Sequence, residues 1–391
     1  MILCVVRLRA VLVVLMVCLV LGIAWGCLDR PRVMTTMTAP EDDPPPITSA
    51  INTILHLRSL AILNSQTEGL HRLYDLSVAT GRWALERETR RVKYVGAWAE
   101  KRGLKIVEVS ADGRIVRMEK RENSIWAYVI QSAGFGYVYL DDPEDKVHRF
   151  GVGTRHVMEL ALHGNSWVLK RDWYTDPLDE DTVIPDVTPA ATEHLIGTVL
   201  ASELPYVARR QKYQRAAAVQ YANTYCGAAW GCGNEGRYNQ DYRDYTGLGG
   251  DCTNFASQVL GDPDAGALPG TSVWHYAKQG WRGAGSTAWV KADAFGRYLS
   301  HSGTAHLVGR GTYRHIVEPA SNEAMSLIAR LEPGDLIAYE EKRRIVHFAV
   351  VTNKDSKGVL LVNSHTVDRY QVPWDLGWDQ KTVFWLFHVH D

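Results

Sequence analysis

Two periodicities follow one another between residues 47 and 175. From Ile47 to Arg102, apolar side chains recur about every 3.6 residues, which predicts three helices with breaks near Asn64 and Gly69. After Gly103 the apolar positions alternate, as they do in half-buried strands. Helices followed by a meandering sheet predict an α+β domain over this part of the chain.

The alternating runs predict six strands, at 104–109, 114–120, 125–132, 136–140, 150–162 and 167–173. Three helices covering such a curved antiparallel sheet resemble the cone-shaped NTF2-like domains, a likeness of fold that implies no activity. We interpret the basic face of the third helix as solvent-exposed rather than as a surface for anionic polymer or lipid. Its side chains are Arg87, Arg90, Arg91, Lys93, Lys101 and Arg102.

The first 27 residues have the pattern of a targeting segment. Two arginines precede an apolar run from Ala10 to Gly26, and Cys27 follows it directly. Three interpretations stay open: a cleaved signal peptide, a lipoprotein signal in which Cys27 is lipidated, and an uncleaved membrane anchor. Each places the folded protein outside the cytoplasm, secreted or attached to the outer face of a bacterial membrane. Residues 28–46 are proline-rich and predict an extended tether.

An acidic segment follows the last of these strands. Residues 172–181 hold several Asp and Glu residues without the spacing of a calcium-binding loop, so we interpret them as solvent-exposed. Prolines continue beyond them. The sequence therefore predicts a first domain over 47–175, a linker over 176–210 and a second domain over 211–391.

Composition excludes several classes of protein. The chain has 391 residues, of which 43 are basic and 44 acidic, and 46% are hydrophobic. These proportions are those of a globular protein, and they leave no charge surplus for general binding of nucleic acid. The six cysteines include no CxxC pair, which argues against a zinc ribbon. The terminal pair His388 and His390 lacks further metal ligands, and we expect neither a metal nor another cofactor.

The stretch from Gly249 to Leu260 predicts a glycine turn followed by a helix. Asp251 is the expected N-cap, and Cys252 is then the first helical residue. The free amide groups and the dipole at a helix start favour a thiolate, and the Cys252 N–H is a candidate oxyanion donor. From spacing alone, Cys252 fits a small buried apolar residue equally well.

A thiolate nucleophile needs a base, and the candidate is His347. It interrupts an apolar run at 345–352 that predicts a strand, and burying an imidazole costs free energy unless it has a partner. On the next predicted strand, Asn363 and His365 share one face by alternation, and either would suit the group that orients the imidazole. The alternative is a core histidine next to a polar pair at a strand end.

Four segments together resemble the bacterial putative amidase domain family, which is grouped with the NlpC/P60-like, papain-like cysteine hydrolases. They are Gly250–Gln258 (GDCTNFASQ), Pro333–Leu336, Val346–Thr352 and Asn363–Thr366, and the predicted helix Tyr213–Tyr225 matches the family's opening. The resemblance covers about residues 211–391. It implies an α+β domain whose nucleophile begins a helix that packs on an antiparallel sheet. It also implies Cys252 as nucleophile, His347 as base, and His365 or Asn363 as the third member.

Cys226 and Cys232 depart from the family's loop, which normally contains no cysteine. Outside the cytoplasm we expect a disulfide between them, which leaves Cys252 free; the alternative is two reduced thiols in a loop. A second departure is Val346, because an acidic residue is common in the family before the histidine.

Taken together, the sequence predicts an extracytoplasmic cysteine amidase or peptidase. Its substrate would be an amide in or near the cell envelope, with peptidoglycan stem peptide as the first candidate. The expected partners are this substrate and, through the N-terminus, the membrane, but no nucleic acid. Two alternatives stay open: a surface-binding protein with a vestigial Cys-His pair, and an acyl transferase that uses the same chemistry.

Overall fold

A computed structural model describes residues 45–176, 178, 213–278, 283–319 and 325–391. The predicted targeting segment with Cys27, the tether up to residue 44, and all of the predicted linker except Asp176 and Leu178 lie outside these ranges. Residues 44–391 form one unit.

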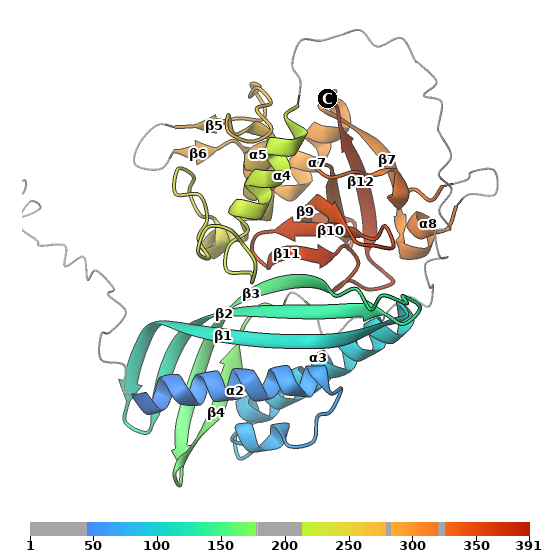
Figure 1. The fold of residues 1–391 in the computed structure, drawn as a ribbon. Helices are drawn as coiled ribbons and strands as arrows, with labels where there is room; N and C mark the ends of the chain where they lie inside the picture. The colour runs from blue at the N-terminus through green and yellow to red at the C-terminus, as the bar shows by residue number, and fades with distance from the viewer. Residues whose placement is uncertain (1–44, 177, 179–212, 279–282, 320–324) are drawn as a thin grey trace, which may run out of the picture. The chain divides into compact units, whose positions relative to one another are not determined.

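Two long helices and a curved antiparallel sheet build the first half of the unit (Figure 1). The helices are α2 (Pro45–Leu63) and α3 (Ala79–Lys101), with the 3-10 turn η1 (Leu70–Leu73) between them. The strands are β1 (Leu104–Arg121), β2 (Ser124–Tyr139), β3 (His148–His163) and β4 (Ser166–Trp173), and each pairs antiparallel with the next. The α+β class with an antiparallel sheet is confirmed, whereas the second predicted helix is only the η1 turn.

Two predicted breaks within strands are wrong, because β1 runs through residues 110–113 and β2 through residues 133–135. Gly113 lies beneath α2, where a Cβ atom would be 2.7 Å from Leu55 Cδ1. Gly134 lies beneath Trp230, where a Cβ atom would be 2.8 Å from the indole ring. These glycines therefore allow a neighbouring segment to approach the strand closely, and they do not turn the chain.

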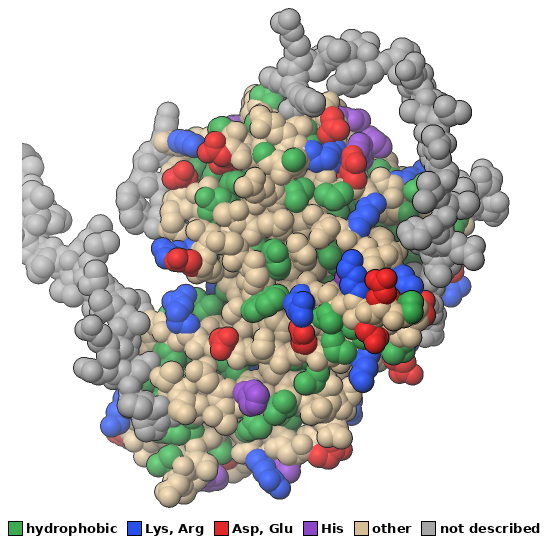
Figure 2. Space-filling model, in the orientation of Figure 1, with side chains coloured by type: hydrophobic (Ala, Val, Ile, Leu, Met, Phe, Trp, Pro, Cys, Tyr) green, Lys and Arg blue, Asp and Glu red, His purple; other side chains and the backbone are tan. Residues whose placement is uncertain are grey.

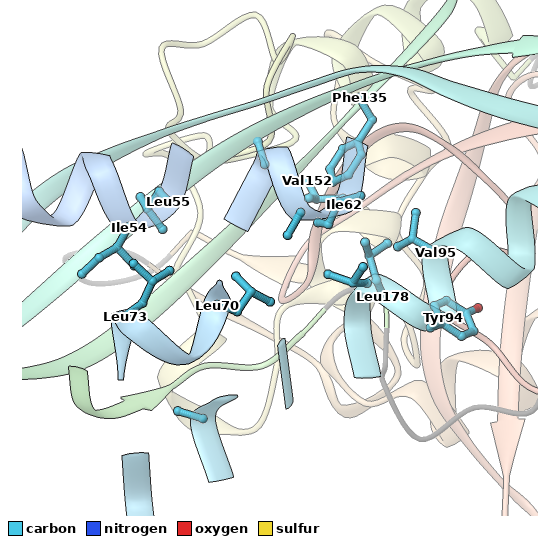
Figure 3. Packing of buried hydrophobic residues seen from close by; sticks show 14 of the residues in the cluster. Ile54, Leu55, Ile62, Leu70, Leu73, Tyr94, Val95, Phe135, Val152 and Leu178 are labelled. Atoms are coloured by element: carbon cyan, nitrogen blue, oxygen red, sulfur yellow. The ribbon is translucent and has the colours of Figure 1, made fainter. Parts of the chain in front are cut away.

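The core of this half lies between the helices and the sheet (Figure 3). Leu55 of α2 and Val95 of α3 pack with Phe135 of β2 and Val152 of β3, and all four are buried. Leu178, beyond the last strand, is buried in the same cluster. The apolar stripes of the helices thus cover one face of the sheet, as their period predicts.

Two carboxylates that we expected in solvent are buried ion-pair partners. Asp172 lies 2.7 Å from Arg58, and its second oxygen is 3.0 Å from His156 Nδ1. Asp176 pairs with Arg91 at 3.5 Å. Burial raises the pKa of Asp172, but His156 and Arg58 together lower it by more, so that the net shift of this pKa is downward. Arg102 is likewise buried and pairs with Asp375. The interpretation of these aspartates, of Arg91 and of Arg102 as solvent-exposed is therefore wrong.

The second half contributes the remaining elements. The helices are α4 (Arg215–Thr224), η2 (Thr246–Leu248), α5 (Cys252–Gly261), α6 (Thr287–Val290), α7 (Ala292–His301), α8 (Tyr313–Val317) and η3 (Ile328–Arg330). The strands are β5 (Tyr276–Ala277), β6 (Ala284–Gly285), β7 (Ala305–Thr312), β8 (Leu336–Glu341), β9 (Arg344–Lys354), β10 (Leu360–Ser364), β11 (Asp368–Pro373) and β12 (Val383–Val389).

One sheet runs through both halves because β11 pairs antiparallel with β3. Its order is β1-β2-β3-β11-β10-β9-β8-β12-β7, and β4 pairs with β3 off this path. The division into domains over 47–175 and 211–391 stays a prediction.

The two faces of β9 belong to different cores. Phe348 packs with residues of α5 and α7, including Phe255 and Phe295. Ala349 packs on the other face, with Tyr339 and Trp374. Successive strand residues point to opposite faces, so α5 covers the face to which Phe348 points.

Charged side chains of both signs are interspersed on the face drawn in Figure 2, as the net charge of −1 leads one to expect. Among the helices of the described ranges, none is both long and apolar enough to cross a membrane.

We predict that Asp172→Asn destabilises the protein by about 3–5 kcal/mol, because it removes the closer of the two carboxylates that pair with the buried Arg58 charge; the other, Glu88, lies 3.7 Å away. Urea unfolding monitored by circular dichroism measures this change. The control is Glu86→Gln, which breaks the exposed pair between Glu86 and Arg90 and should cost less than about 1 kcal/mol. Equal effects of the two variants would contradict the assignment.

Candidate active site

The predicted glycine turn and helix lie where the sequence places them. Gly249 and Gly250 have φ values of +112° and +124°, Asp251 is the N-cap, and Cys252 begins α5. The Asp251 N–H donates to Thr366 Oγ1 at 2.6 Å, which ties the turn to the segment after β10. Such positive φ values favour glycine, so these two residues shape the approach to Cys252.

Although Asp251 is the N-cap residue, its carboxylate accepts no hydrogen bond from the backbone N–H groups of the first turn of α5. One oxygen accepts the backbone N–H of Tyr245 at 2.8 Å and the side-chain Nδ2–H of Asn254 at 2.9 Å, and the other lies 2.6 Å from His365 Nδ1. Asp251 is buried. Its side chain therefore connects the preceding loop, the first turn of α5 and the end of β10.

His365 is held on four sides. Its Nε2 lies 2.5 Å from the Tyr225 carbonyl oxygen, and the rings of Tyr238 and Phe255 stack on it at 3.6 and 4.0 Å. The Tyr225 carbonyl and the Asp251 carboxylate are both acceptors, so both contacts are hydrogen bonds only when each ring nitrogen carries a proton. The strand β10 ends at Ser364, and His365 belongs to the turn after it. His365 thus fixes the turn around Asp251.

Asn363 is also fully engaged. Its amide nitrogen donates to the Ala222 carbonyl at 3.0 Å and to Asn223 Oδ1 at 2.9 Å, while its oxygen accepts the Gln371 N–H at 2.7 Å. Asn363 and His365 therefore both reach the C-terminal end of α4. Neither side chain bonds to His347 in the described structure, so a role as third catalytic member stays a prediction.

Cys252 is the free cysteine of the described residues, and it is 6% exposed. Burial raises the pKa of its thiol, while hydrogen bonds from the backbone of Phe348 and from Thr253 lower it; burial has the larger effect. The expectation that the helix start yields a resting thiolate is therefore not met. The thiol is neutral until something at the site takes its proton.

His347 points away from α5. Its ring lies 5.6 Å from that of Tyr339 and 5.7 Å from that of Trp378, on the opposite face of β9 from the Phe348 side chain. Burial, with a smaller contribution from Arg369, lowers its pKa to about 3, and its Nε2 has no hydrogen-bond partner in the described structure. The backbone of Phe348, the next residue, thus bonds to the thiol of Cys252, whereas the imidazole of His347 does not.

The structure joins Cys226 and Cys232 by a disulfide, with a Cα–Cα distance of 5.6 Å. The short loop that it closes lies on β2 and β3, because a Cβ atom at Gly151 would collide with the Trp230 backbone. This loop begins directly after Tyr225, which bonds to His365.

Sequence reasoning missed Asp368. Its carboxylate accepts hydrogen bonds from Tyr238 at 2.5 Å, Arg155 at 3.0 Å and the Ala228 N–H at 2.8 Å. The segment HTVDRY carries no signal for this role, because the pairing of β11 with β3 is what brings Arg155 to the aspartate.

Residues 212–388 match the model of a family described as the putative amidase domain. This match confirms the resemblance at the level of that domain and supports a hydrolase that acts on amide bonds. None of the curated proteins matches the chain. Membership of the NlpC/P60-like superfamily and the papain-like fold stay predictions.

Three solved structures are similar to about a third of the chain each, with TM-scores of 0.21 to 0.23. The intermembrane space region of chloroplast protein ARC6 has 17% identity and a TM-score of 0.23, covering 34% of this chain and 98% of that one. A putative scytalone dehydratase from Novosphingobium aromaticivorans has 15% identity and a TM-score of 0.23, with coverage of 32% and 80%. A variant named Rd1NTF2 has 14% identity and a TM-score of 0.21, with coverage of 34% and 100%. The NTF2-like fold of the first half stays a prediction.

We predict that Cys252 reacts slowly with iodoacetamide at pH 6–7 and faster as the pH rises above the ordinary range of a thiol, because burial raises its pKa and limits access. Mass spectrometry of the alkylated, folded protein over a pH series gives the rate. A free cysteine in a short peptide is the reference. Faster labelling than the peptide at pH 6 would contradict the buried neutral thiol.

We predict that His347 lowers stability in mild acid. The unfolded state binds a proton near pH 6.5 but the folded state only near pH 3, so stability falls as the pH drops from 6.5 towards 3. Relative to His347→Phe, the wild type should lose about 2 to 3 kcal/mol between pH 7 and pH 4.5. Urea unfolding at both pH values measures the difference, with His301→Gln as an exposed control. A pH-independent difference would contradict this assignment.

Proposed function

We propose that this protein hydrolyses an amide bond outside the cytoplasm and that Cys252 is its nucleophile. The observation that carries the proposal is the position of Cys252. It is the free cysteine of the described residues, it begins α5 after two glycines with positive φ, and it lies within the segment that matches the amidase family. A cysteine at a helix start lies beside backbone N–H groups that have no partner within the helix.

The proposed reaction has two steps. Cys252 Sγ forms a bond to the amide carbonyl carbon, the carbon–nitrogen bond breaks, and the amine leaves with a proton. Water then attacks the thioester, releases the carboxylic acid and restores the thiol. The Cys252 backbone N–H is the proposed donor to the oxyanion that forms in both steps.

The proposed base is His347, after a one-residue shift of β9 that turns its side chain to the face of Cys252; a bulge already lies beside it, between the pairs Tyr339–His347 and Glu340–Ile345. Two observations support this. The backbone of the next residue, Phe348, already bonds to the thiol, and the buried Nε2 of His347 has no partner in its present position. An unpaired buried polar atom costs about 1–3 kcal/mol, which a hydrogen bond to the thiol would recover. The low pKa of His347 keeps the imidazole neutral where it now lies, and a move out of this desolvated position would restore its basicity.

His365 is proposed as a positioning residue that acts through Asp251, and Asn363 as a second support from β10. The extracytoplasmic location is supported by the Cys226–Cys232 disulfide, because such bonds persist in oxidising compartments. We propose that the substrate lies in the cell envelope, with peptidoglycan stem peptide as the first candidate.

We predict that the purified protein releases acid and amine products from a digest of bacterial cell wall and that Cys252→Ala abolishes this release. His347→Gln should lower the rate by about 10²–10⁴-fold, and His365→Ala and Asn363→Ala by about 10–1000-fold. Mass spectrometry of the digest, with circular dichroism to check folding, measures each effect. The control His275→Gln should keep the wild-type rate.

The outcomes separate the alternatives. Wild-type activity of Cys252→Ala would overturn the nucleophile. Full activity of His347→Gln with loss in His365→Ala would move the base to His365. A product that carries an added amine in place of water would show acyl transfer, and the absence of any product would favour a binding protein.

A further inference from the structure

A polar hollow of about 450 Å³ lies at the junction of β3, β9 and β11, apart from Cys252. The side chains that give it its chemistry are Lys146, Trp230, Asn353, Lys354, Tyr370 and Gln371. Its size is that of a small-molecule site. None of these residues takes part in the proposed cysteine chemistry.

Two aromatic rings line the hollow and are held in place by glycines. Trp230 lies on Gly134 and Gly151, where side chains would collide with it, and it remains 38% exposed. Tyr370 lies against Gly231, whose φ is +87° and whose Cβ atom would be 2.5 Å from the ring. Because this packing already fixes the exposed indole of Trp230, the ring presents a rigid apolar surface and loses little conformational entropy when a ligand binds.

The charge in the hollow is positive. Lys146 and Lys354 are exposed, and no carboxylate is paired with either one in the described structure. Arg149 is already neutralised by Glu108, which accepts two hydrogen bonds of 2.8 Å from it. The one carboxylate of the lining, Asp355, accepts the hydroxyls of Tyr137 and Tyr139 at 2.8 and 2.6 Å. These hydrogen bonds do not cancel the charge of Asp355, so the two lysines against this one carboxylate leave a formal charge of +1, which attracts an anion.

The amides of Asn353 and Gln371 add groups that both donate and accept hydrogen bonds, as sugar hydroxyls do. We infer that the hollow binds a sugar ring that carries a carboxylate. The apolar face of the ring packs on Trp230 and Tyr370, its hydroxyls bond to the amides, and its carboxylate pairs with the lysines.

The hollow and the cysteine share the segments that build them. The disulfide-closed loop that carries Trp230 follows Tyr225, whose carbonyl bonds to His365, which in turn bonds to Asp251 beside Cys252. The inference deepens the proposed function and rests on it only for the statement that this sugar belongs to the substrate whose amide is cleaved.

The test is calorimetric titration of Cys252→Ser with N-acetylmuramic acid and with N-acetylglucosamine, which differ by the carboxylate-bearing group. We expect the acidic sugar to bind about three- to tenfold more tightly. Lys146→Met combined with Lys354→Met should remove this preference, and Trp230→Ala should weaken both sugars by about tenfold. The controls are Lys381→Met and Trp83→Ala, exposed residues outside the hollow.

Equal affinity for the two sugars, or no binding to folded protein, would overturn the inference. Binding of inorganic polyphosphate that competes with the acidic sugar and is insensitive to Trp230→Ala would show a general anion site and would also overturn it. Sugar binding with no amide cleavage by the wild type would support the hollow as a sugar site and refute the proposed function. Cleavage that is equally fast with and without the acidic sugar would support the proposed function but refute the statement that this sugar belongs to the substrate.

Discussion

The buried carboxylate of Asp251 is the interaction on which the candidate site depends. It binds the loop before α5, the first turn of that helix and His365 after β10, all through hydrogen bonds shorter than 3 Å. A buried charge is tolerated only where its partners surround it, so these three segments have to meet at one place. Cys252 is the next residue in the chain, and its position follows from theirs.

Burial also sets the chemical state of the site. The thiol of Cys252 and the imidazole of His347 are both held in their neutral forms, because desolvation disfavours a thiolate and an imidazolium alike. A resting ion pair of the kind that activates many catalytic cysteines is thus disfavoured here. If Cys252 is the nucleophile, as we propose, proton transfer has to accompany its attack on a substrate, and burial shields the thiol from oxidants in the resting protein.

The antiparallel pairing of β3 with β11 determines contacts in both halves of the unit. It brings Arg155 of the first half to Asp368 of the second, and it places the disulfide-closed loop over glycines of β2 and β3. Residues of the first half therefore pack against the loop and β11 of the second half. The polar hollow is lined from both halves, and it forms because they share one sheet.

The sequence by itself determined the kinds of element and several local arrangements: the helix-then-sheet order, the glycine turn before α5, and Cys252 at the helix start. Each of these follows from periodicity or from backbone conformation, which neighbouring residues control. Tertiary structure alone decided that Asp172 is buried, that Gly113 and Gly134 lie within strands, and that His347 faces away from α5. Alternation along a strand shows which residues share a face, but what covers each face depends on segments far away in the chain.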